Sequence, residues 1–116
     1  MVAIGILALV LLTPLAFRKF ESWAVGVHQR SVTRSLAAWE VEYSQVRNDA
    51  EADRAIDMLE YVQDYYVPGP GYHSDARTEA ALETQRARTV DAIVTALREF
   101  SGQDFGADAA KWRARR

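Results

Sequence analysis

The chain has 116 residues, of which 14 are basic and 16 are acidic, so its formal net charge is −2 at pH 7. This length suits one small domain rather than two, and the slight acidic excess argues against the broad basic surface of a nucleic-acid-binding protein. Cysteine is absent, which excludes disulfides, thiolate metal sites and a cysteine nucleophile.

An uncharged run over residues 2–17 follows Met1 and ends at Arg18 and Lys19. As a helix it would measure roughly 24 Å, a little less than the hydrocarbon core of a bilayer at about 30 Å. Its apolar side chains point in all directions, which is more apolar surface than so small a domain can cover. The run predicts a single transmembrane span, and a buried helix of a soluble domain is the alternative.

Side chains at the end of this run suit the boundary between lipid and water. Arg18 and Lys19 can extend to the headgroups, while Phe17, Phe20 and Trp23 have the aromatic character of interfacial residues. We therefore expect a membrane anchor over residues 1–23, with these five side chains at the membrane interface. Basic side chains follow the run and none precedes it, which favours a cytoplasmic location for the rest of the chain.

Residues 24–47 carry apolar side chains at intervals of mostly three, four or seven, as on one face of a helix. The members are Val25, Val32, Leu36, Trp39, Tyr43 and Val46. Trp39, Val41 and Tyr43 also alternate with acidic residues, as in a strand, but one isolated strand would have no partner elsewhere in the chain. The pattern predicts a helical stalk that continues from the span.

A second helix is predicted from Asn48 or Asp49, either of which can cap it, to about residue 67. Its apolar stripe has amphipathic spacing and consists of Ala52, Ala55, Ile56, Leu59, Val62 and Tyr66. The opposite side is strongly acidic, because residues 48–70 hold six acids and one arginine. This side is a solvated surface or, as the alternative, the docking surface of a basic partner on the acidic helix 50–67.

Residues 67–74 form a predicted connector, because two prolines remove backbone donors and two glycines permit turns. Tyr65, Tyr66, Tyr72 and His73 gather around it. They are candidate partner-binding residues, and the alternative is that they close the end of a helical hairpin.

The sequence provides no catalytic constellation. His73 and His28 have no second chemical group at a spacing that predicts a meeting with it, so each is best interpreted as a surface histidine. We expect no catalytic residue, no metal site and no cofactor.

A long helix is predicted from Ser74 or Asp75 to about Phe100. Its core stripe is clearest in the second half and consists of Val90, Ile93, Val94, Leu97 and Phe100. Gly102 is suited to end this helix, since glycine readily adopts the left-handed conformation found at helix ends.

Asp108 can cap a last short helix that carries Trp112. Phe105 and Trp112 are expected to clamp onto the preceding hairpin. The same two rings are also candidate partner-binding residues.

The last part of the chain reads Leu97-Arg98-Glu99-Phe100-Ser101-Gly102-Gln103-Asp104-Phe105-Gly106, followed by Asp108 and then Trp112-Arg113. This segment resembles the closing segment of bacterial HEAT-like repeat proteins, in which a helix ends in a Gly-x-Asp-Phe-Gly turn and a tryptophan-bearing helix caps the stack. The resemblance covers residues 97–113. It implies an α-helical binding scaffold without catalysis, often in exported proteins, and so a periplasmic location.

The sequence therefore predicts an all-α chain with a transmembrane anchor over 1–23, a helical stalk over 24–47 and a small extrinsic domain over 48–116. That domain would be a helical hairpin with a short C-terminal cap helix. The expected function is that of a non-catalytic subunit that binds and stabilises a larger complex in the bacterial inner membrane, with a photosynthetic or respiratory assembly as the first guess.

Its partners would be integral membrane protein subunits and membrane lipid, without nucleic acid and without a small-molecule substrate. A membrane-anchored adaptor or sensor that uses the acidic helix is the alternative. A small enzyme is the least favoured class.

Overall fold

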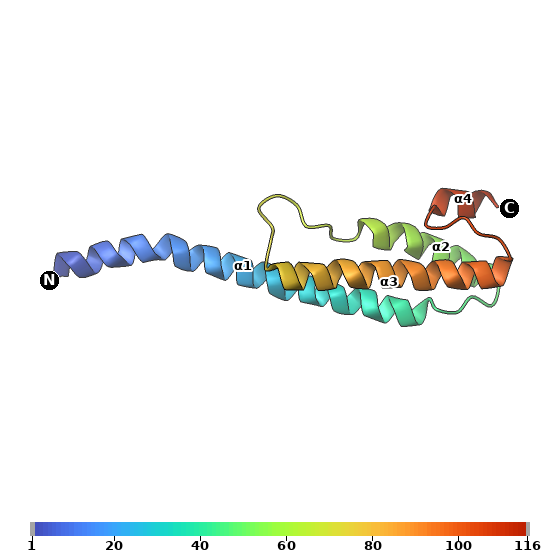
Figure 1. Cartoon of the computed structure of the whole chain (residues 1–116), viewed down its shortest axis with the longest axis horizontal. Helices are drawn as coiled ribbons and strands as arrows, with labels where there is room; N and C mark the ends of the chain where they lie inside the picture. Colours follow the sequence, from blue (N-terminus) through green and yellow to red (C-terminus); the bar gives the residue numbers. More distant parts are fainter. Residues whose placement is uncertain (1, 116) are drawn as a thin grey trace.

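The computed structural model describes the backbone of residues 2–115 and the side chains of residues 14–115. Four helices follow one another over this range: α1 (Val2–Glu42), α2 (Asp49–Asp64), α3 (Ala76–Ser101) and α4 (Ala109–Ala114). The all-α part of the predicted fold class fits this architecture. Figure 1 shows that α3 runs alongside the C-terminal half of α1 and along α2, while α4 lies on α2.

The predicted transmembrane anchor over residues 1–23 is wrong, and so is the single-pass location in the inner membrane. Within the part of the chain that the structure describes, no helix combines the length and the apolar character that crossing a bilayer requires. The helix α1 is long, but its apolar character ends at Arg18, Lys19 and Glu21, whose charged side chains do not suit the interior of a bilayer. Most of the apolar run that motivated the prediction, residues 2–13, lies outside the described side chains.

Local capping explains where the other helices begin and end. The Asn48 side chain accepts a hydrogen bond from Glu51 N at the start of α2, and Asp75 accepts one from Thr78 N at the start of α3. The helix α3 ends at Gly102, whose backbone adopts the left-handed conformation at φ 69° and donates to Arg98 O. These boundaries agree with the cap residues that the sequence predicts.

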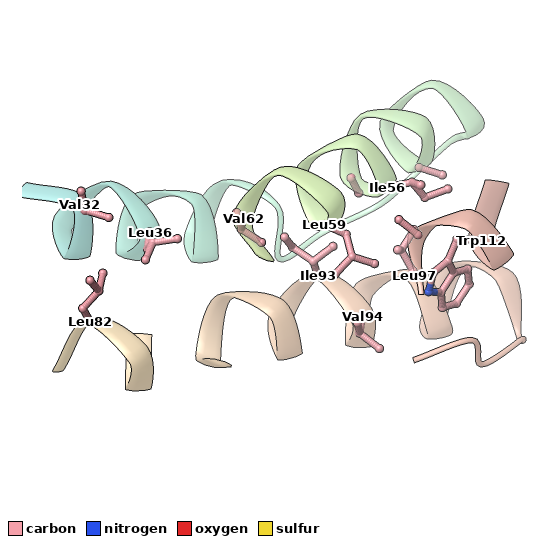
Figure 2. Close-up of a cluster of buried hydrophobic side chains, with 13 residues drawn as sticks. Val32, Leu36, Ile56, Leu59, Val62, Leu82, Ile93, Val94, Leu97 and Trp112 are labelled. Carbon is pink, nitrogen blue, oxygen red and sulfur yellow. The ribbon is translucent and has the colours of Figure 1, made fainter. Parts of the chain in front are cut away.

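Among the described side chains, the buried apolar residues form a cluster that all four helices share. Ala52, Ala55, Ile56, Leu59 and Val62 of α2 are buried as predicted, and the sixth member of the stripe, Tyr66, is half-buried. Figure 2 shows the cluster extending from Val32 and Leu82 at one end to Trp112 at the other. The periodic apolar stripes therefore meet one another, which is the arrangement of a three-helix bundle closed by a short cap.

The molecule is elongated, with principal extents of 76 × 22 × 20 Å. Its length comes from α1, whose N-terminal part extends beyond the bundle with no other helix beside it (Figure 1). Every described side chain over residues 14–24 is exposed, whereas burial begins with Gly26 and Gln29. We refer to residues 14–24 as the arm.

Candidate functional site

The arm presents large apolar side chains to solvent. Leu15, Phe17, Phe20 and Trp23 are 55–62% exposed, and the rings of Phe20 and Trp23 contact each other with centroids 5.9 Å apart. Successive members at 17, 20 and 23 are three residues apart, so these three rings share one side of the helix. Contiguous exposed apolar side chains are characteristic of interaction sites.

The five predicted membrane-interface residues all belong to the arm. Phe17, Arg18, Lys19, Phe20 and Trp23 are exposed there. Their expected role beside lipid depended on the span, which the structure does not support. What the structure shows is a helical segment that combines three aromatic side chains with two adjacent basic ones.

The four residues predicted around the connector do not form one lip. Tyr66 contacts His28 edge to face, at 4.6 Å between ring centroids, while Tyr65 packs elsewhere. Tyr72 is 65% exposed, and His73 turns toward the first turn of α3. The predicted binding surface is therefore divided among separate environments.

Tyr65 belongs to an aromatic cluster that the sequence analysis missed. Its ring lies 5.1 Å from Trp39 and 5.1 Å from Tyr61, and Trp39 and Tyr61 are 5.7 Å apart. Beside this cluster is a hollow of about 450 Å³, lined by Asp57, Glu60, Tyr61, Asp64, Tyr65 and Tyr66. The four-residue spacing of Tyr61 and Tyr65 indicates that the two rings lie on the same side of a helix. The contact with Trp39 could not be predicted from the sequence, because it depends on how α1 packs against α2.

Arg86 holds the end of α2 against α3. Its guanidinium is buried and donates to Val62 O at 2.6 Å, Tyr65 O at 2.7 Å and Tyr66 O at 2.7 Å. The last carbonyls of a helix have no hydrogen-bond donors within the helix. A positive charge there is also attracted to the negative end of the helix dipole. Arg86 therefore fixes the backbone from which the tyrosines project.

His73 and Glu79 form a polar cluster at the start of α3. The Glu79 carboxylate accepts from His73 Nδ1 at 3.0 and 3.1 Å and from Ser74 N at 2.8 Å, and these hydrogen bonds hold the pKa of Glu79 below its ordinary value. Ser74 Oγ donates to the buried Gln29 Oε1 and not to the histidine. The cluster ties the connector to α1 and α3. Among the described residues, no group of three or more His, Asp or Glu is placed to hold a metal ion.

The C-terminal pair is internal to the fold. Trp112 is fully buried, its Nε1 donates to Gly106 O at 2.7 Å, and its ring meets Phe105 edge to face at 5.0 Å. Phe105 is half-buried. The pair closes the end of the bundle, as expected from the clamp interpretation, and Trp112 presents no exposed surface to a partner.

Comparison with known proteins finds no matching family model, no similar curated protein and no similar solved structure. The resemblance of residues 97–113 to HEAT-like repeat proteins therefore stays a prediction.

Proposed function

We propose that this chain is a non-catalytic subunit that docks onto a larger protein assembly through the arm of α1. The observation that carries the proposal is the exposure of Leu15, Phe17, Phe20 and Trp23 on a helix that extends beyond its own bundle. Large aromatic side chains dominate the binding energy of many protein interfaces when a partner covers them.

The spacing of these side chains suits a helix that lies in a groove of its partner. Phe17, Phe20 and Trp23 recur every third residue, and Val27, which is 41% exposed, follows four residues later. Anchors at intervals of three and four are characteristic of helix-in-groove recognition. The partner would therefore offer an apolar groove, with acidic groups near Arg18 and Lys19.

Continuity with the bundle favours binding by a preformed helix. The arm and the packed part of α1 belong to one helix, so the bundle supplies the nucleus from which the helix extends. A segment that is already helical loses less conformational entropy on docking than one that must fold on its partner.

Site-specific photo-crosslinking in cells tests the proposal. A photoreactive phenylalanine analogue replaces Phe20 or Trp23, and Val41 is the matched control because it is 75% exposed on the same helix but within the bundle. We expect one discrete crosslinked species at positions 20 and 23 and none at position 41. Equal products at all three positions, no product, or only a dimer of this chain would contradict the proposal.

The second candidate is an adaptor that binds a basic partner through α2. The Trp39–Tyr61–Tyr65 cluster beside Asp57, Glu60 and Asp64 favours it, since aromatic faces and carboxylates both attract cationic side chains. Arg113 of the same chain pairs with Asp57 at 2.9 Å and also with Glu60, which supports a guanidinium as the kind of group that this surface would bind. The same crosslinking analogue at Tyr61 separates the two candidates, because only the adaptor gives a product there.

A further inference from the structure

A second solvent-facing region, separate from the arm, lies between α1 and the first turns of α3. It is a cleft of about 360 Å³ lined by Arg30, Thr33, Arg34, Arg77, Thr78 and Ala81. We refer to it as the arginine cleft. Its volume lies at the lower end of the range for small-ligand pockets, roughly 300–1,000 Å³.

Within the described part of the chain, the three arginines of the cleft make no close ion pair of the kind that other arginines of the bundle make. Arg88 lies 3.4 Å from a carboxylate oxygen of Glu40, and Arg98 lies 2.8 Å from one of Asp104. Among the described residues, neither Arg30, Arg34 nor Arg77 has a carboxylate oxygen within 4.0 Å. The positions three and four residues away from each of them carry no acid either.

The three positive charges of the cleft repel one another. Arg30 and Arg34 are four residues apart on one helix, where like charges repel. Arg77 adds a third positive charge from the opposite side of the cleft. An anion bound between them would remove the repulsion.

Two carboxylates near the cleft are already occupied. Asp75 accepts from Thr78 N and from Thr78 Oγ1, both at 2.8 Å, and it attracts Arg30 at longer range. Glu79 accepts from His73 and Ser74. Both carboxylates are therefore engaged at the start of α3 by donors other than the three guanidiniums.

We propose that the arginine cleft binds a small anion with two linked phosphate groups. A guanidinium donates two parallel hydrogen bonds to a phosphate, which makes arginine the side chain best suited to this recognition. One phosphate group carries a charge of about −1.5 to −2 near neutral pH, so two groups match three arginines better than one does. The Thr33 and Thr78 hydroxyls supply further polar contacts at the wall of the cleft.

The test is calorimetric titration of the full chain with inorganic pyrophosphate, without divalent metal and at constant ionic strength. The variants Arg34→Gln and Arg77→Gln each remove one guanidinium from the cleft. Arg54→Gln is the matched control, because Arg54 is an exposed arginine of α2 that does not line this cleft. We expect saturable binding that weakens at least tenfold in each cleft variant and less than twofold in the control.

Two further measurements keep the result interpretable. The broadening of the pyrophosphate ³¹P signal by the unaltered protein reports binding without any variant, and thermal melting verifies that each variant is folded. Absence of saturable binding would overturn the proposal, and so would equal weakening by Arg54→Gln, because that indicates general charge attraction. Binding of inorganic phosphate as tight as that of pyrophosphate would overturn the assignment of two phosphate groups.

Discussion

The two parts of α1 place similar side chains in opposite environments. In the arm, Phe20 and Trp23 are 61% and 62% exposed, whereas Val32 and Leu36, further along the same helix, are almost completely buried. Both parts are helical and both are rich in apolar residues. The comparison shows that helix formation and core formation are separable along one element. Apolar residues in the bundle stabilise the fold, and those in the arm are available for a partner.

The largest expected effect comes from comparing two tryptophans. Trp112→Ala should lower the free energy of unfolding by about 3–5 kcal/mol, because it removes a fully buried ring and leaves a cavity. Trp23→Ala should change it by less than about 0.5 kcal/mol, because the ring lies in the arm. Urea unfolding of both variants measures the difference. Similar losses in the two would show that the arm packs on the bundle.

Arg86 gives the next largest effect. Arg86→Met should destabilise the fold by about 2–3 kcal/mol, because three carbonyls at the end of α2 lose a charged donor. Arg86→Lys should be intermediate, since one ammonium cannot reproduce the planar fork of a guanidinium. Arg54→Met, at an exposed arginine of α2, is the control and should melt like the unaltered protein. A fully stable Arg86→Met variant would contradict the capping role.

Thr89 joins α3 to the C-terminal half of α1, which packs in the bundle. Its hydroxyl is buried, lies 2.8 Å from Leu36 O and 2.9 Å from Gln85 O, and links α3 to α1. Thr89→Val should cost about 1 kcal/mol of unfolding free energy, the usual contribution of one hydrogen bond. The exposed Thr95→Val, on the same helix, is the matched control. Equal urea midpoints for the two variants would exclude a stabilising role for this link.

The smallest effect is on the pH dependence of stability. The His73 and Ser74 hydrogen bonds lower the pKa of Glu79 from its ordinary value of 4.5. The stabilisation that these hydrogen bonds give to the folded state is therefore complete above about pH 4.5. It is lost as the pH falls through the lower pKa of Glu79 in the folded state. The urea midpoint of Glu79→Gln should fall less between pH 6 and pH 3 than that of the unaltered protein. Glu21→Gln, in the arm, is the control, and parallel curves for all three proteins would refute the assignment.

The parts of the fold that depend on local chemistry were predictable from the sequence. Asn48 and Asp75 cap helices because a short polar side chain can bond the free amides of the first turn. The stripe of α2 was recognisable because its apolar residues repeat at the helical period. Trp112 could be placed at the cap because Asp108 and Gly102 mark the helix boundaries on either side of the turn.

Features that depend on contacts between distant helices were not predictable. The role of Arg86 depends on where α2 ends against α3, and the arginine cleft exists only because α1 lies beside α3. The predicted membrane anchor was wrong for a different reason. Charged side chains begin at Arg18, and within the part of the chain that the structure describes no helix is long and apolar enough to cross a bilayer. The spacing of apolar residues predicts which side of a helix they share, whereas the exposure of their side chains depends on how the helices pack.

The connector after α2 is attached to the bundle at both of its ends. Arg86 binds the carbonyls of Tyr65 and Tyr66 at its start, and Glu79 accepts from Ser74 N at its finish. The two ends are held by separate contacts, and the entropic cost of closing a flexible loop grows only slowly with the number of added residues. A chain cleaved at the peptide bond between Pro70 and Gly71 would leave two complementary fragments, α1–α2 and α3–α4, with the core still divided between them. Recombining the two fragments would measure how strongly the two halves of the core associate, and the same loop is a suitable position for an inserted tag.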